Sequence, residues 1–197
     1  MRSRWIVLLE AAAVTLFFAL LALLTLRVGR GASGGQQLAL LLLAAGGGYA
    51  LADLASGLTH WFCDSFFRED TPGIGRVLIF PFREHHRDPA AMTRHGFFEL
   101  TGNSCMGVLP FLGLAAWRPW SLLLDAGLIA FALALFATNL FHKWAHSPQV
   151  PRAVGWLQRC HLILNPARHA VHHAPPNKGA YCVTNGWMNA LLDRILS

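Results

Sequence analysis

The sequence is poor in charged residues. Only 13% of its 197 residues are charged, whereas 54% are hydrophobic. Soluble domains carry roughly a quarter charged residues, so this composition argues against an ordinary water-exposed surface. Acidic residues are scarcer than basic ones: ten Asp and Glu against sixteen Lys and Arg leave a net charge of +6. No RNA- or DNA-binding motif accompanies this charge, so we expect it to face anionic lipid headgroups and not nucleic acid.

Several motifs of metal and redox proteins are also missing. The four cysteines form no C-x-x-C pair, which excludes zinc-ribbon and iron–sulfur patterns and is typical of free thiols in a reducing compartment. No G-x-G-x-x-G motif follows a strand, so we expect no built-in dinucleotide domain. No Glu-x-x-His pair marks a soluble two-metal carboxylate bundle.

Long apolar runs are abundant instead. A run of about 20 residues lets a helix cross a hydrocarbon core of roughly 30 Å. Three runs have this length: 5–26, 37–61 and 121–141. A weaker fourth segment, 104–117, contains Pro110 and reaches about 21 Å as a helix, so it would cross tilted or form a hairpin with 121–141. We expect a single all-α domain over 1–197, a polytopic membrane bundle of about four helices.

The amino-terminal run has features of a signal peptide, because Arg2 and Arg4 precede it. It is longer than the 7–15 residues of a signal core and ends without a small-residue cleavage site, so we expect a retained helix. With four crossings, Arg27, Arg30 and Arg118 are the only three of the sixteen basic residues on one side. The positive-inside rule then predicts that both termini are cytoplasmic.

Histidine is abundant in the second part of the chain and absent from the first. All ten histidines follow residue 59. The four-helix topology, which was derived without them, brings every one of them to the cytoplasmic face. We therefore expect a His-rich helical cap built from 64–103 and 142–197, adjoining His60 at the end of the second apolar run.

The histidine spacing indicates metal binding. His142 and His146 lie one helical turn apart, and His169, His172 and His173 converge on one side of a turn. Neutral imidazole binds zinc, copper, iron and nickel, whereas a structural zinc needs only four ligands. So many imidazoles indicate a histidine-only site for two metal ions. The best ligand candidates are His60, His85, His86, His142, His146, His169, His172 and His173.

Four further residues have two interpretations each. Asp64, one turn after His60, either binds metal or orients a ligand by accepting its other N–H. Asp53, two turns deeper, is either a functional acid that holds His60 or a neutral hydrogen-bonded side chain of the bundle. His95 and His161 are either further ligands, neighbours that support the ligands, or polar anchors at the membrane interface.

Six stretches, in chain order, resemble the plasmanylethanolamine desaturase family, which carries the lipid desaturase domain. They are HWFCD (60–64), PFREHHRDPAAMTRHGFFE (81–99), HKWAH (142–146), LQRCHLILNP (157–166), and HAVHHAPP (169–176) with YCVTNGWMN (181–189). The resemblance covers most of the chain from 53 to about 192. One departure is Phe82, because general membrane desaturases carry a full H-x-x-H-H where this chain has FREHH. The ligand set is therefore not a direct copy of theirs.

The resemblance implies an oxygen-dependent desaturase that forms the vinyl ether bond of a plasmalogen in the O-alkyl chain of an ether phospholipid. It implies two histidine-bound iron ions, O₂ as co-substrate and a separate electron donor of the cytochrome or ferredoxin type. The basic face, including Arg87 and Arg94, would dock an acidic donor. Similarity to bacterial members implies an inner-membrane location with the metal site on the cytoplasmic side.

Two other functions stay open. An acyl-lipid desaturase or a di-iron lipid hydroxylase shares the first hydrogen abstraction and differs only in the later steps of the reaction. A non-enzymatic membrane metal carrier or sensor is a third class. A carrier needs ligands along a path through the bilayer, whereas here the apolar segments contain almost none.

Overall fold

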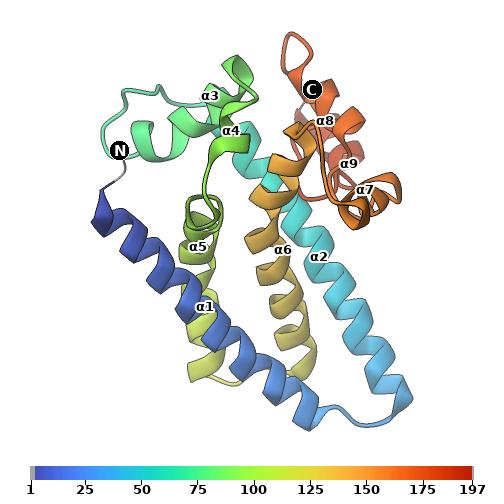
Figure 1. Cartoon of the computed structure of the whole chain (residues 1–197). Helices are drawn as coiled ribbons and strands as arrows, with labels where there is room; N and C mark the ends of the chain where they lie inside the picture. Colours follow the sequence, from blue (N-terminus) through green and yellow to red (C-terminus); the bar gives the residue numbers. More distant parts are fainter. Residues whose placement is uncertain (1–2, 197) are drawn as a thin grey trace. The chain divides into compact units, whose positions relative to one another are not determined.

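The computed structural model describes residues 3–196, so Arg2 lies outside the described residues. Within this range the chain is helical and contains no strand, which confirms the all-α prediction. The elements are α1 (Arg4–Gly31), α2 (Gly34–Ser65), a π-helical turn η1 (Gly75–Ile79), α3 (Phe80–Arg87), α4 (Ala91–Arg94), α5 (Phe97–Trp117), α6 (Leu122–His146), α7 (Arg152–Arg159), α8 (Pro166–His173) and α9 (Asn189–Leu196) (Figure 1).

Three helices of the described chain are long and apolar enough to cross a membrane, namely α1, α2 and α6. They cover the three long apolar runs except Ser121, and each continues four or five residues past the end of its run. The fourth expected segment forms only the later part of α5, which has 21 residues and continues past Pro110. This helix starts earlier than predicted because Glu99 caps it, accepting a hydrogen bond from the Gly96 amide at 3.4 Å.

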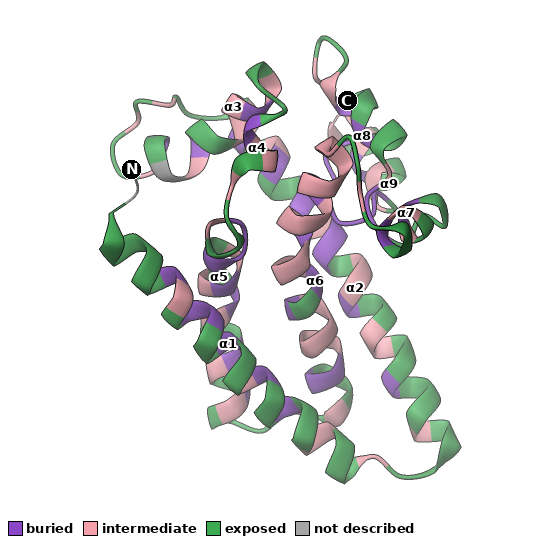
Figure 2. Cartoon of the chain, viewed as in Figure 1, coloured by how far each residue is buried: buried purple, intermediate pink, exposed green. Residues whose placement is uncertain are grey.

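The chain divides into two compact units. The first comprises the chain up to Ala52 together with Gly96–Ala137. In it, α1 packs along α5 around an apolar core that includes the fully buried Phe17, Leu24 and Leu112 (Figure 1). Large apolar side chains such as Trp5 remain exposed along α1, and Figure 2 shows this exposed face. An apolar exterior of this kind suits contact with lipid.

Two close contacts organise the first unit. A Cβ atom at Gly48 would overlap the carbonyl of Gly127, so glycine lets the α2 and α6 backbones touch. The Arg27 guanidinium lies 3.3 Å from the buried Asp125 carboxylate and donates to the Ala115 carbonyl at 2.8 Å. Arg27 thereby neutralises a buried acid and caps the end of α5.

The second unit comprises Asp53–His95 and the chain from Thr138 onward. It receives the carboxyl-terminal parts of α2 and α6 and adds the short helices α3, α4, α7, α8 and α9. All ten histidines belong to this unit. The final turns of α2 and α6 thus belong to the second unit, which otherwise consists of short helices and turns.

Candidate metal centre

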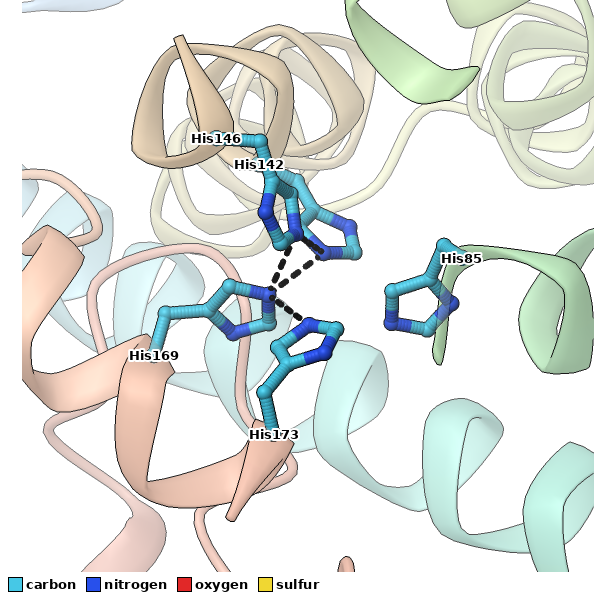
Figure 3. Close-up of side chains that lie close together, drawn as sticks. All are labelled: His85, His142, His146, His169 and His173. Carbon is cyan, nitrogen blue, oxygen red and sulfur yellow. Dashed lines mark hydrogen bonds between the residues drawn. The ribbon is translucent and has the colours of Figure 1, made fainter. Parts of the chain in front are cut away.

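One group of five histidines converges in the second unit (Figure 3). α6 supplies His142 and His146, α8 supplies His169 and His173, and α3 supplies His85. One ring nitrogen from each lies within 4.8 Å of the others, so the group could hold a metal ion. Within each pair on α6 and on α8, the two histidines lie on the same face of their helix, because residues four apart are one turn apart.

The nitrogen spacing of this group cannot be explained by hydrogen bonding alone. The Nε2 atom of His169 lies 2.8 Å from that of His142, 2.9 Å from that of His146 and 3.0 Å from that of His173. A neutral imidazole has one N–H, so one nitrogen cannot form three such contacts as paired donor and acceptor. Metal–nitrogen bonds of about 2.1 Å at right angles would place the nitrogens about 3 Å apart, so the spacing fits a shared cation.

A second group is formed by His60, His85, His86 and His172. The His172 Nε2 atom lies 3.1 Å from His60 Nε2 and 3.2 Å from His86 Nε2. The Asp64 Oδ2 atom lies 3.1 Å from His86 Nε2 and 3.5 Å from the Nε2 atoms of His60 and His172. Asp64 therefore faces the same point as three imidazoles and offers the group an anionic oxygen.

His85 belongs to both groups. Its ring is buried, and its centroid lies 4.3 Å from that of His86 and 5.0 Å from those of His142 and His173. Its Nε2 atom has no hydrogen-bond partner within the described chain. A buried nitrogen without a partner is costly unless its lone pair binds something, which again fits a metal ion.

Backbone carbonyls orient two ligands of the second group. The Nδ1 atom of His60 lies 3.2 Å from the Tyr181 carbonyl, and that of His172 lies 2.9 Å from the Gly179 carbonyl. Donation of the Nδ1–H to these oxygens leaves the Nε2 lone pair directed into the group. The sequence carried no signal for this contact, because any residue supplies a carbonyl.

The electrostatics favour neutral imidazoles that are ready to bind metal. Burial, with the neighbouring histidines, lowers the pKa of His85 to about 2 and that of His173 to about 3. Burial likewise holds the pKa of His169 well below its usual value. The lone pairs of these rings are thus free of protons at neutral pH, as metal ligation requires.

Arg83 was not singled out from the sequence, yet it connects the two helices that carry the second group. Its guanidinium, on α3, donates to carbonyls at the end of α2, where the helix leaves its last carbonyls without partners. The accepting residues are Cys63 (3.2 Å), Asp64 (3.3 Å), Phe66 (3.1 Å) and Phe67 (2.7 Å). Arg83 thereby fixes His60 and Asp64 relative to His85 and His86.

Asp53 has a different contact from the one expected with His60. Its Oδ1 atom accepts backbone N–H bonds from Thr184, Asn185 and Gly186 at 2.9–3.2 Å, and Oδ2 accepts one from Met188 at 2.9 Å. Both oxygens therefore hold the 184–188 turn. The turn that Asp53 holds lies close in sequence to Tyr181, whose carbonyl orients His60.

His95 and His161 lie outside both groups. His95 is half-buried, and its carbonyl accepts a hydrogen bond from Lys143 at 2.8 Å. His161 is exposed in a left-handed conformation (φ 55°), and its carbonyl accepts from the Trp187 indole at 2.7 Å. In both cases the backbone forms the contact and the imidazole remains apart from the clustered rings.

The two cations expected to dock an electron donor are paired locally. Arg87 donates to both Glu69 carboxylate oxygens, at 2.7 and 3.1 Å. Arg94 donates to Asp88 at 2.7 Å. These contacts compensate the charge at each position, so neither arginine presents an isolated positive charge to a partner.

Known proteins resemble most of this chain. The model of the lipid desaturase domain matches residues 49–196. Plasmanylethanolamine desaturase of Myxococcus xanthus is 44% identical over 152 residues, covering 75% of this chain and 54% of that protein. Plasmanylethanolamine desaturase 1 of Mus musculus is 39% identical over 164 residues, covering 75% and 58% of the two chains.

A plant protein is also similar. Fatty acid desaturase 4, chloroplastic, of Arabidopsis thaliana is 36% identical over 152 residues, covering 74% of this chain and 46% of its own. The chain spans about half the length of the curated relatives that it matches. No solved structure matches it.

Proposed function

The chain belongs to the lipid desaturase domain family, and from this we propose that it forms the vinyl ether bond of a plasmalogen in the O-alkyl chain of a plasmanyl phospholipid. The observation that carries the proposal is the pair of histidine groups joined at His85. Two adjacent iron ions would suit O₂ chemistry on an unactivated alkyl chain, which side chains alone cannot supply. The names of the two plasmanylethanolamine desaturases support the ether lipid as substrate.

The proposed reaction is a dehydrogenation next to the ether oxygen. Two hydrogen atoms leave the neighbouring alkyl carbons, and a carbon–carbon double bond forms between them. O₂ is reduced to two water molecules, which takes the two electrons and two protons from the alkyl chain plus two electrons and two protons from outside. A separate donor, of the cytochrome or ferredoxin type, would supply the external electrons.

The donor set of the described residues fits two iron ions. His142, His146, His169 and His173 would hold one, and His60, His86, His172 and Asp64 would hold the other, with His85 between them. Bound iron would supply the one-electron and oxygen chemistry that side chains lack. The protein keeps the ligand nitrogens unprotonated through burial, and it orients His60 and His172 through the Tyr181 and Gly179 carbonyls.

The decisive experiment is expression in a host that makes plasmanyl lipids but no plasmalogens. Acid-labile vinyl ethers, detected by the aldehydes they release, should appear only with O₂ and vanish in a His172→Ala variant. A His161→Asn variant is the matched control, since it removes an exposed imidazole of the same unit and suits the left-handed backbone there. Absence of vinyl ether from an iron-loaded wild-type protein would refute the proposal.

A second candidate is acyl-lipid desaturation or hydroxylation. Similarity to fatty acid desaturase 4 of Arabidopsis thaliana favours it. The same expression experiment separates the two, because a new double bond or hydroxyl in an ester-linked acyl chain would replace the acid-labile ether. Iron binding without any lipid product would instead favour a metal-binding protein that is not an enzyme.

A further inference from the structure

A polar cleft opens beside the second histidine group. It has a volume of about 560 Å³. Its lining includes Asp64 and His86 from that group, and Pro176, Asn177, Lys178 and Tyr181 from the segment after α8. Space of this size next to candidate metal ligands can hold a charged group of a substrate.

The position of the reacting bond limits where such a charged group lies. This step rests on the proposed function, in which the reacting carbon is bonded to the ether oxygen on the first glycerol carbon. The phosphate on the third glycerol carbon is then six bonds away, which spans roughly 7 Å in an extended chain at about 1.2 Å per bond. The phosphate must therefore bind close to the metal groups.

Lys178 is held at a fixed position relative to two site histidines. The side-chain amide of Asn177 donates to the His172 carbonyl at 3.1 Å and lies 3.3 Å from His86 Nδ1. On the other side, the Gly179 carbonyl accepts from His172 Nδ1 at 2.9 Å. Both neighbours of Lys178 are thus bonded to the second group, which places the Lys178 backbone beside that group.

The charge at the cleft suits an anion. Lys178 is exposed, and no described carboxylate forms an ion pair with it. Arg83 also lines the cleft, but its Nε and Nη2 atoms donate to the end of α2, so it adds positive potential and little direct bonding. The Asp64 Oδ2 atom lies 3.1–3.5 Å from three imidazole nitrogens, so this oxygen faces the candidate metal position.

Aromatic side chains place the cleft at headgroup depth. At the end of α2, Phe66 lies 5.2 Å from Trp61 and 5.5 Å from Phe62, and Phe67 lies 5.5 Å from Phe62, measured between ring centroids. Phe66 and Phe67 are exposed and directly follow Ser65, which lines the cleft. Exposed aromatic clusters at the end of a membrane helix are typical of the lipid–water interface.

From these observations we propose that the cleft binds the phosphodiester of the phospholipid substrate, with Lys178 as its cationic ligand. Binding there holds the glycerol next to the second histidine group. The carbons beside the ether oxygen then lie within reach of that group, whereas carbons farther along the chain do not. The phosphate contact thereby selects the bond that is desaturated.

A kinetic comparison tests the proposal. Lys178→Ala should lower kcat/KM about tenfold for 1-O-alkyl-2-acyl-phosphatidylethanolamine, because it removes a charge-assisted contact. For 1-O-alkyl-2-acylglycerol, which lacks phosphate, the change should stay below about twofold, and Lys178→Arg should restore activity on the phospholipid. Arg68→Ala, at an exposed arginine paired with Asp70, is the control for loss of a positive charge.

A second measurement does not depend on turnover. The chain has only two lysines, and the other, Lys143, is half-buried and donates to the His95 carbonyl. In detergent micelles, acylation of Lys178 by an amine-reactive ester, read by mass spectrometry, should slow at least threefold with the ether phospholipid and stay unchanged with the alkylacylglycerol. Acylation of Lys143 is the internal reference.

The outcomes separate this proposal from the proposed function. Equal acylation of Lys178 with both lipids, or an unchanged kcat/KM in Lys178→Ala, would overturn the phosphate site even if vinyl ethers are made. If Lys178→Ala lowers only the rate of reduction by the electron donor, the phosphate site is overturned and Lys178 is assigned to docking of the donor. Selective protection by the phospholipid supports the site, even if the double bond appears in another chain.

Discussion

His85 is the residue on which both histidine groups depend. Every other histidine of the two groups belongs to only one of them, whereas His85 is common to both and keeps a buried nitrogen without a hydrogen-bond partner in the described chain. Its loss should therefore affect two ions at once. A ligand such as His173, which belongs to one group, provides the matched comparison.

We predict that His85→Ala binds less iron than His173→Ala. Each substitution should lower the affinity for the affected iron ion at least tenfold. Even residues that only support metal ligands change metal affinity by about 10–100-fold when they are replaced. His85→Ala should thus lose iron from both positions and His173→Ala chiefly from one, with iron per chain measured by elemental mass spectrometry. Retention of two ions by His85→Ala would contradict a shared role for this residue.

The lowered histidine pKa values make the metal-free protein sensitive to acid. An unfolded histidine takes up a proton near pH 6.5, whereas buried His85 and His173 do so only near pH 2 and 3. Below about pH 6.5 the unfolded chain therefore binds more protons than the folded chain, and acid favours unfolding. Stability is unaffected by these groups above that pH and is lost progressively as the pH falls toward the folded values.

The melting temperature of the metal-free protein in detergent should accordingly be higher at pH 7.5 than at pH 5.5. Replacing His173 with Gln removes one of the titrating groups and should make this difference smaller. A melting temperature that is the same at both values would show that these rings are not buried as the structure describes.

At the level of elements, the end of α2 depends on a side chain of α3. Four carbonyls near that end accept hydrogen bonds from Arg83, and these bonds align two helices that both carry candidate ligands. Asp53 plays a similar part from within α2, because its carboxylate holds the 184–188 turn. Polar contacts between backbone and side chain thus help to arrange this unit.

We predict that Arg83→Ala destabilises the protein by about 2–3 kcal/mol, the cost of charge-assisted hydrogen bonds lost at a half-buried position. Iron content should fall as well, because His60 and His86 lose their alignment. Arg87→Ala is the control, since its exposed pair with Glu69 should contribute less than about 1 kcal/mol. Thermal unfolding and iron analysis of both variants test this, and equal effects would contradict the capping role.

At the scale of the whole molecule, the number of membrane crossings depends on where two helices end. His60 near the end of α2 and His142 near the end of α6 have ring centroids 6.0 Å apart, so both helices end on the same side. If α2 and α6 both span the bilayer, the chain must return across it between Ser65 and Leu122. α5 is the helix available for that crossing in the described chain, although it is less apolar than the other three.

Labelling with a membrane-impermeant maleimide tests this topology. Cys160 is the exposed cysteine, and the other three are buried. In intact spheroplasts Cys160 should stay unlabelled, whereas an Arg118→Cys variant in a Cys160→Ser background should react, because Arg118 is exposed at the end of α5. Labelling of both positions from the same side would show that α5 does not cross.

The sequence predicted the helical class, the long apolar runs and the histidines that meet. Those features depend on local periodicity, since a run of apolar residues or a spacing of four along a helix has the same meaning in any context. It missed the true start of α5 because the Glu99 cap lies in a polar stretch that continues the helix. It also left Asp64 and Asp53 with two interpretations each, since the sequence does not predict which group a carboxylate contacts.

The sequence by itself determined that imidazole would gather at one end of apolar helices, because residue type and spacing set which face a side chain occupies. Only the tertiary structure decided that His85 joins two groups, that Asp64 faces three nitrogens while Asp53 holds a turn, and that Arg83 connects α2 to α3. The reason is physical. Most of these contacts link residues distant along the chain, and those of Asp53 and Arg83 are made with backbone amides or carbonyls, which every residue carries.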